Sequence, residues 1–318
     1  MNLNPEKLLE RCHKGQWRIE DFDWEQTPQV KMDKEKEIRV CTYYMNMSYI
    51  ERMAGALFLA LSKKMTDPTL KAIYESFHGD EIRHSQAALK IMDYFDVHHY
   101  KVYTPSPAML KFLPHFTKAV DTLNPAIANH FVLFGELILD IALLRGLNDY
   151  VDDPLSREVI DKINSDESRH IAMDFYMTEY CSKNNMNSKS GKLTDSLALV
   201  GVSRWAPEFF KDVFFKPMEM MDPEQKQLKD IMKRVRRYYL RDEVQNNPMV
   251  QSFNNSADFF ESRVGGIFGR RAEKAVKLFS GLDLDFLRAG HTDNLSVKKG
   301  DVENLGNAAL AKVMSVTE

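Results

Sequence analysis

Apolar side chains recur every three or four residues along most of the chain, the spacing that places them on one face of an α-helix. Four strong helices are predicted in this way, over about 36–64, 67–95, 125–151 and 153–182. Three weaker helical patterns follow, over about 193–216, 223–243 and 256–279. The stretch 104–124 is less regular and contains three prolines. No run in the first half alternates between apolar and polar residues as a strand does, so the sequence predicts an all-α fold.

The most informative feature of the sequence is an internal repeat, in which six residues reappear 86 positions later. The first copy is Asp67, Pro68, Asp80, Glu81, Arg83 and His84, and the second is Asp153, Pro154, Asp166, Glu167, Arg169 and His170. Each Asp-Pro pair indicates a helix start, because aspartate caps the first turn and proline fits the first helical position. A single glutamate lies upstream of each copy in an apolar stretch, Glu51 in one and Glu136 in the other. A two-helix unit used twice predicts a four-helix bundle.

The repeat gathers residues that can bind metal. A glutamate and a histidine three positions apart on a helix project from the same face. The predicted bundle contains four carboxylates and two imidazoles of this kind: Glu51, Glu81, His84, Glu136, Glu167 and His170. This donor set is the one that holds two iron or manganese ions inside a helical bundle. A lone Glu-x-x-His is common on solvated helices, but two copies with upstream glutamates favour a dinuclear metal site over a merely structural repeat.

Glu136 lies in a helix that is apolar on every side, and such a helix is predicted to be buried. An isolated buried carboxylate is very costly, so it must be protonated, paired or bound to metal. Asp140 lies one turn further along and has the same requirement. It is a candidate catalytic residue, as an acid or proton relay near the metals, or else the partner of an arginine such as Arg145. The sequence leaves both interpretations open.

Asp80 and Asp166 are candidate partners of the metal-binding histidines, which usually donate their second N–H to a carboxylate. Each aspartate is expected to reach the histidine of the other helical hairpin, with Arg83 and Arg169 balancing the charge. The alternative is ordinary ion pairing on a helix surface. His78, three residues before Glu81, is interpreted as a polar helix residue rather than as an additional ligand, because six ligands already complete the set.

The segments Asp80-Glu81-Ile82-Arg83-His84 and Asp166-Glu167-Ser168-Arg169-His170 resemble the ligand motifs of the ferritin-like diiron-carboxylate superfamily. They are most similar to the hydroxylase subunits of bacterial multicomponent monooxygenases and also resemble the soluble acyl-carrier-protein desaturases. The resemblance covers roughly 40–180. It implies one metal held by Glu51, Glu81 and His84. It implies a second held by Glu136, Glu167 and His170, with one or two carboxylates bridging the pair.

At three positions the chain differs from related families, and these differences narrow the range of functions that the resemblance implies. Ribonucleotide reductase small subunits keep a radical tyrosine four residues after the first histidine, where this chain has Ala88. The hydroxylating monooxygenases keep a threonine at the position of Asp140. The arylamine N-oxygenases of the superfamily carry an additional histidine ligand where this chain has Ile163. Because the chain has Ala88 in place of the radical tyrosine, a radical generator of the reductase type is not expected.

The resemblance implies an oxidoreductase with two Fe ions, or an Fe/Mn pair, and O2 as co-substrate. Such an enzyme would hydroxylate, desaturate or N-oxygenate a small-molecule or carrier-bound organic substrate. Apolar residues at Phe131, Leu133, Phe134 and Leu137 favour a substrate with an apolar part. Electrons would come from a separate reductase or ferredoxin, since the sequence has no flavin or iron–sulfur motif. Related bundles often form homodimers. The alternatives are a ferroxidase or other iron-handling protein, and a non-catalytic bundle subunit of a larger complex.

Composition and charge limit which partners and which cellular location the sequence predicts. The net charge of −3 gives no reason to expect nucleic acid as a partner. The longest nearly apolar run, 131–144, is too short and too charged to be a membrane span. Three widely spaced cysteines and the absence of a basic, apolar leader predict a cytoplasmic protein. We expect one ferritin-like helical domain over 1–288, with the metal-binding bundle at about 36–183, accessory helices at about 193–286, and a flexible polar tail at 289–318.

Overall fold

The structure is a computed structural model that describes residues 3–138, 144–184, 191–221 and 226–261. These residues form α-helices with short 3-10 and π segments, and none of them forms a strand. The all-α prediction is therefore confirmed. Asp140, the range 262–279 of the last predicted helix, and the tail 289–318 lie outside the described residues.

The elements follow one another as short and long helices along the chain. The α-helices are α1 (Pro5–Lys14), α2 (Lys34–Lys64), α3 (Pro68–Phe95), α4 (Pro107–Val120), α5 (Pro125–Glu136), α6 (Arg145–Val151), α7 (Pro154–Lys183), α8 (Gly191–Phe210), α9 (Lys216–Met221), α10 (Lys226–Tyr239) and α11 (Pro248–Glu261). The short segments are the 3-10 turns η1 (Ile19–Asp21) and η4 (Asp242–Val244) and the π turn η3 (Lys211–Phe215).

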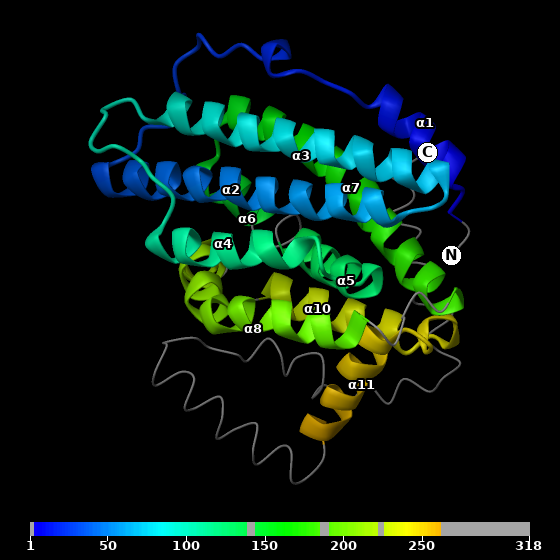
Figure 1. Cartoon of the computed structure of the whole chain (residues 1–318). Helices are drawn as coiled ribbons and strands as arrows, with labels where there is room; N and C mark the ends of the chain where they lie inside the picture. The colour runs from blue at the N-terminus through cyan, green and yellow to red at the C-terminus, as the bar shows by residue number, and fades with distance from the viewer. Residues whose placement is uncertain (1–2, 139–143, 185–190, 222–225, 262–318) are drawn as a thin grey trace.

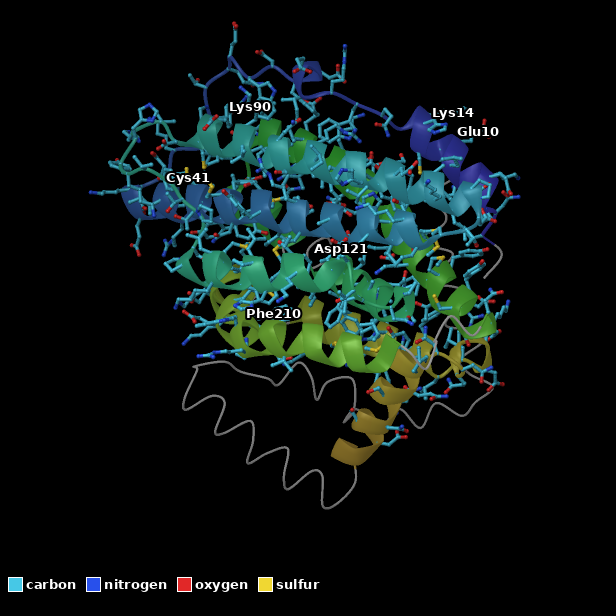
Figure 2. The ribbon with its side chains drawn as sticks, in the orientation of Figure 1. Glu10, Lys14, Cys41, Lys90, Asp121 and Phe210 are labelled. Carbon is cyan, nitrogen blue, oxygen red and sulfur yellow. The ribbon has the colours of Figure 1, made fainter. Side chains whose placement is uncertain are left out.

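Four helices surround the centre of the molecule. The short loop between α2 and α3 turns the chain back, so the two helices lie side by side, and α5 packs against α7. Contacts of α2 with α5 and of α3 with α7 join the two pairs (Figure 1). Helices α8 and α11 pack onto α4 and α5 respectively. Side chains fill the spaces between the ribbons (Figure 2).

The Asp-Pro signals act as the sequence predicts. The Asp67 carboxylate accepts hydrogen bonds from the first-turn amides of Thr69 and Leu70, and α3 begins at Pro68. The Asp153 carboxylate caps α7 in the same way by accepting from the amide of Ser156. Both helices therefore start at the predicted residues, which fixes the register of the two repeat copies.

Several element boundaries differ from the prediction. The irregular stretch 104–124 contains α4, which Ser106 caps and in which Pro114 is accommodated because the helix buries an apolar face on its neighbours. Within the predicted helix 125–151, α5 ends at Glu136 and π-helical residues follow at 137–138, and another π-helical residue at 144 precedes α6, which begins at Arg145. The range 139–143 lies outside the described residues. Helix α11 starts eight residues before the predicted 256, because Pro248 occupies its first turn.

The apolar core has two parts, and each takes residues from all four central helices. One part includes Met47, Ile91, Leu133 and Ile163. The other includes Phe58, Phe77, Val132 and Met173. The predicted metal ligands of α2, α3 and α7 fall between these positions in the sequence, so a polar centre lies between two apolar regions. Among the described helices, none combines the length and the apolar character that crossing a bilayer requires.

Candidate metal centre

The six predicted ligands come together at the centre of the four helices. Helix α2 contributes Glu51, α3 contributes Glu81 and His84, α5 contributes Glu136, and α7 contributes Glu167 and His170. None of the six exposes more than 2% of its surface. Ionisable side chains are almost never buried to this extent unless they are paired or bind a metal.

The ligand atoms form two overlapping groups of four. Within each group the atoms lie within 4.8 Å of one another. The first group is Glu51, Glu81, His84 and Glu167, and the second is Glu81, Glu136, Glu167 and His170. Glu81 and Glu167 belong to both groups, so they occupy the positions from which a carboxylate can bridge two ions.

The arrangement of the donor atoms fits metal cations. Nδ1 of His84 lies 3.0 Å from Oε1 of Glu167, and Nδ1 of His170 lies 3.0 Å from Oε1 of Glu81. Neither contact has hydrogen-bond geometry, and Nδ1 of His84 and both oxygens of Glu81 have no hydrogen-bond partner. Buried polar atoms without partners are rare in folded proteins. Four carboxylates and two imidazoles supply the oxygen and nitrogen donors that iron and manganese accept.

A close approach of two helices makes this geometry possible. A Cβ atom at Gly55 of α2 would lie 3.0 Å from Cβ of Glu81 and 3.3 Å from Nδ1 of His78 on α3. With a larger residue here the neighbouring atoms would have to move by a few tenths of an ångström, so glycine favours this close approach of the two helices one turn after Glu51. The imidazole of His78 donates from Nδ1 to the carbonyl of Gly55 at 2.9 Å, and His78 belongs to neither group of ligand atoms.

The outer ring nitrogens of the histidines bond to the two aspartates of the repeat. Nε2 of His84 lies 3.0 Å from Oδ2 of Asp166, and Nε2 of His170 lies 3.3 Å from Oδ2 of Asp80. An ionised carboxylate can only accept, so each imidazole donates its N–H. The expected contact between each aspartate and the histidine of the other hairpin is therefore present. It fixes the ring so that Nδ1 faces the carboxylates.

Two arginines complete this outer layer. Arg83 contacts both Asp80 and Asp166, the latter at 3.1 Å. Arg169 contacts the same two carboxylates, at 2.6 Å to Asp166 and 3.4 Å to Asp80. Both aspartates are buried, so these are interior ion pairs and not the helix-surface pairs of the alternative interpretation.

The carboxylates are held in different protonation states. Burial, together with the charge of Glu167, raises the pKa of Glu51 to about 7. Burial and the neighbouring carboxylates raise the pKa values of Glu81 and Glu136 well above their usual range. Burial also opposes ionisation of Glu167, but the charge of His170 and hydrogen bonds from its neighbours bring its pKa well below normal. Without metal, the centre therefore retains protons that cations would displace.

The histidines are held in their charged form by the same carboxylates. Burial disfavours a charged imidazole, yet the hydrogen bond to Asp166 and the nearby charge of Glu167 raise the pKa of His84 to about 9. The charge of Glu167 and a hydrogen bond to Asp80 likewise outweigh burial and raise the pKa of His170. Protonated imidazoles thus provide the positive charge that bound cations would otherwise supply.

Three residues at the centre were not predicted from the sequence. The side chains of Gln16 and Trp17, in the segment between α1 and η1, donate hydrogen bonds to Asp80 and Asp166. Asp174 lies one turn after His170 on α7, is fully buried, and has no hydrogen-bond partner at either carboxylate oxygen. Its spacing of one helical turn from His170 is a feature of the sequence that could have predicted its position beside the centre. No local pattern indicates the first two.

One predicted feature of α5 is wrong. The helix was expected to be buried on every side, but Phe131 is 40% exposed and Phe134 only half-buried, whereas Leu133 and Leu137 are buried. Helix α5 therefore has one side at the surface, and single exposed apolar residues are common there. Phe131 does not line an enclosed apolar region beside Glu136.

Comparison with known proteins adds no family assignment. No protein-family model matches this chain, and no curated protein matches it. The geometry of the centre is therefore the basis for assigning a function.

Proposed function

We propose that this chain is a non-haem diiron oxidoreductase that activates O2 and hydroxylates, desaturates or N-oxygenates an organic substrate with an apolar part. Two Fe ions, or an Fe/Mn pair, would be held by the six buried ligands. The observation that carries the proposal is the pair of overlapping ligand groups, which share Glu81 and Glu167 and lie beyond the reach of solvent. Two adjoining groups with shared carboxylates favour two ions over one.

The burial of so many ionisable groups argues against a merely structural cluster. Four glutamates and two histidines without metal require shifted protonation states and leave several polar atoms without partners. Replacing such a cluster with apolar residues would be the less costly way to stabilise a fold. Metal binding would offset the free-energy cost of burying these ionisable groups.

Each side chain has a defined task in this proposal. The six ligands bind and position the ions, and Asp80 and Asp166 hold the imidazole rings with Nδ1 directed inward. When bound, the ions supply the redox chemistry that O2 activation requires. The two apolar core regions on either side exclude water from the centre. A ferritin-like bundle is supported by the contacts among α2, α3, α5 and α7.

The substrate and the electron donor come from outside the chain. We propose a separate reductase or ferredoxin as the donor and a small-molecule or carrier-bound substrate. Helices α8 to α11 lie beyond the four central helices, and α8 packs on α4, α9 on α6, and α11 on α5 and α10. A minimal iron-storage bundle does not need these helices, so they favour an enzyme with a substrate or partner surface over the iron-handling alternative.

Oxygen consumption by the reduced, iron-loaded protein tests the proposal. We expect candidate substrates with acyl chains or aromatic rings to accelerate it. The product should gain ¹⁸O from ¹⁸O2, or lose two hydrogens, by mass spectrometry. Glu167→Ala should abolish both signals. The matched control is Glu35→Ala, which removes an exposed glutamate near the start of α2.

Two other results would replace the proposal. Accumulation of ferric iron far beyond two ions per chain, without an organic product, would identify an iron-handling protein. Unchanged metal content and O2 reactivity in Glu167→Ala would show that the centre is not a diiron site, and would favour the non-catalytic subunit.

A further inference from the structure

The segment between α1 and η1 lies against the metal centre, although it precedes all four central helices in sequence. It runs beside α3 (Figure 1), and α1 contacts both α3 and α7. Three consecutive residues of this segment, Gly15, Gln16 and Trp17, meet the aspartate–arginine layer and are called the strap below.

Gln16 joins the strap to the first repeat copy. Its Nε2 donates to Oδ1 of Asp80 at 3.1 Å and to the carbonyl of Cys12 at 2.8 Å. Its Oε1 accepts from Nη1 of Arg83 at 2.9 Å. Both ends of one amide are therefore used, and the amide contacts the aspartate that positions His170.

Trp17 joins the strap to the second repeat copy. Its Nε1 donates to Oδ2 of Asp166 at 2.8 Å, the same oxygen that accepts from His84. The indole ring is nearly parallel to the His84 ring, with centroids 6.2 Å apart, and the guanidinium of Arg83 lies 4.9 Å from the indole centroid. The Trp17 side chain is buried, so these contacts are shielded from water.

Gly15 lets the strap approach the second arginine. A Cβ atom there would lie 2.9 Å from Nη1 of Arg169, closer than real Cβ contacts allow. The backbone of Gly15, with φ −81° and ψ 2°, is one that other residues adopt. The close approach to Arg169, and not the backbone conformation, therefore favours glycine, because a larger residue would displace the guanidinium.

We propose that the strap is a positioning element of the metal centre and that its docking is coupled to metal binding. The inference rests on the proposed function, because it assumes that the six ligands hold metal. Adjacent residues of the strap each donate to one of the two aspartates that orient the two histidines. A docked strap holds both rings in the binding geometry, so metal binding stabilises docking and docking strengthens metal binding by the same factor.

The affinity of the purified protein for Mn²⁺, an air-stable probe, tests this coupling. We expect Trp17→Phe, which keeps a ring but removes the N–H, to weaken binding about tenfold, the lower end for partners of metal ligands. Gly15→Ala should weaken it as well. The matched control is Trp24→Phe, which removes an indole donor from the loop that follows η1, where it bonds to the carbonyl of Ile19.

Two further readouts separate positioning from a loss of stability. The absorption spectrum of the Co²⁺-loaded protein should change in Trp17→Phe but not in Trp24→Phe, because only Trp17 acts on a ligand ring. In the wild-type protein, Mn²⁺ should slow hydrogen exchange at the amides of the strap. This second experiment needs no variant.

The outcomes distinguish the strap from the centre itself. If the wild-type protein binds two Mn²⁺ ions and Trp17→Phe binds them equally tightly, with no change in strap exchange, the strap proposal is wrong and the metal centre stands. If the wild-type protein binds no Mn²⁺, both are overturned.

Discussion

Metal loading of the centre should release several protons, and their number follows from the structure. The perturbation is addition of Mn²⁺ to the metal-free protein at pH 7. Ligands bind a metal in their deprotonated form, so every proton that the empty centre holds must leave. The centre holds protons because burial and crowded carboxylates raise the pKa values of Glu81 and Glu136, and acidic partners raise those of both histidines.

The magnitude is more than about two protons per chain. His84, with a pKa of about 9, and His170, with a pKa well above its usual value, retain their protons at pH 7. Glu51, with a pKa of about 7, contributes about half a proton, and the raised pKa values of Glu81 and Glu136 add to this number. The apparent affinity then rises with pH, by about a factor of ten per pH unit for each proton released.

Calorimetric titration in two buffers of different ionisation enthalpy measures this number directly. The variant Glu35→Gln should release the same number of protons as the wild-type protein, since Glu35 is exposed and far from the centre. Glu81→Gln should release fewer, if it binds metal at all. Mn²⁺ binding with less than one proton released at pH 7 would refute the reasoning from burial and charge.

Three further predictions concern single residues. Gly55→Ala should push α2 away from α3, lower the free energy of unfolding by about 1–3 kcal/mol and weaken metal binding. The control Gly79→Ala should have none of these effects, because its Cβ would meet nothing within 4 Å. Denaturant unfolding and metal titration compare the two variants. Burial raises the pKa of Asp174, so its neutral form is favoured in the folded state and its stabilising contribution falls as pH rises above 3.8. Asp174→Asn should therefore gain stability relative to wild type as the pH rises from 4 to 7, and an unchanged difference in denaturant unfolding would contradict this. Because Trp17 is stacked on His84, Mn²⁺ should quench part of the tryptophan fluorescence in wild type but not in Trp17→Phe.

Local signals in the sequence predict most of the central architecture. The apolar spacing predicted the ranges of α2, α3 and α7 to within about two residues at each end, and the Asp-Pro pairs located two helix starts. The same kind of signal, Asn4 followed by Pro5, marks the unpredicted α1, where Asn4 caps the first turn. Helices with strong caps and one apolar face are readable because both features are local.

Long-range contacts could not be predicted in this way. Trp17 meets Asp166 across 149 residues of sequence and Gln16 meets Asp80 across 64, with no periodicity or motif linking them. The six ligands could be predicted to lie together because each hairpin has the same spacing of its ligand residues. The strap belongs to neither hairpin, so only the folded chain reveals its contact with the aspartates.

Elemental analysis of bound metal per chain tests the central claim most directly. The protein should be purified and, if needed, reconstituted anaerobically with ferrous iron, alongside Glu81→Ala and the exposed control Glu35→Ala. The account predicts about two ions, iron or iron with manganese, in the wild-type protein and the control, and their loss in Glu81→Ala, which removes a ligand shared by both groups. A wild-type protein that stays free of metal after reconstitution, or a Glu81→Ala protein that keeps both ions, would contradict it.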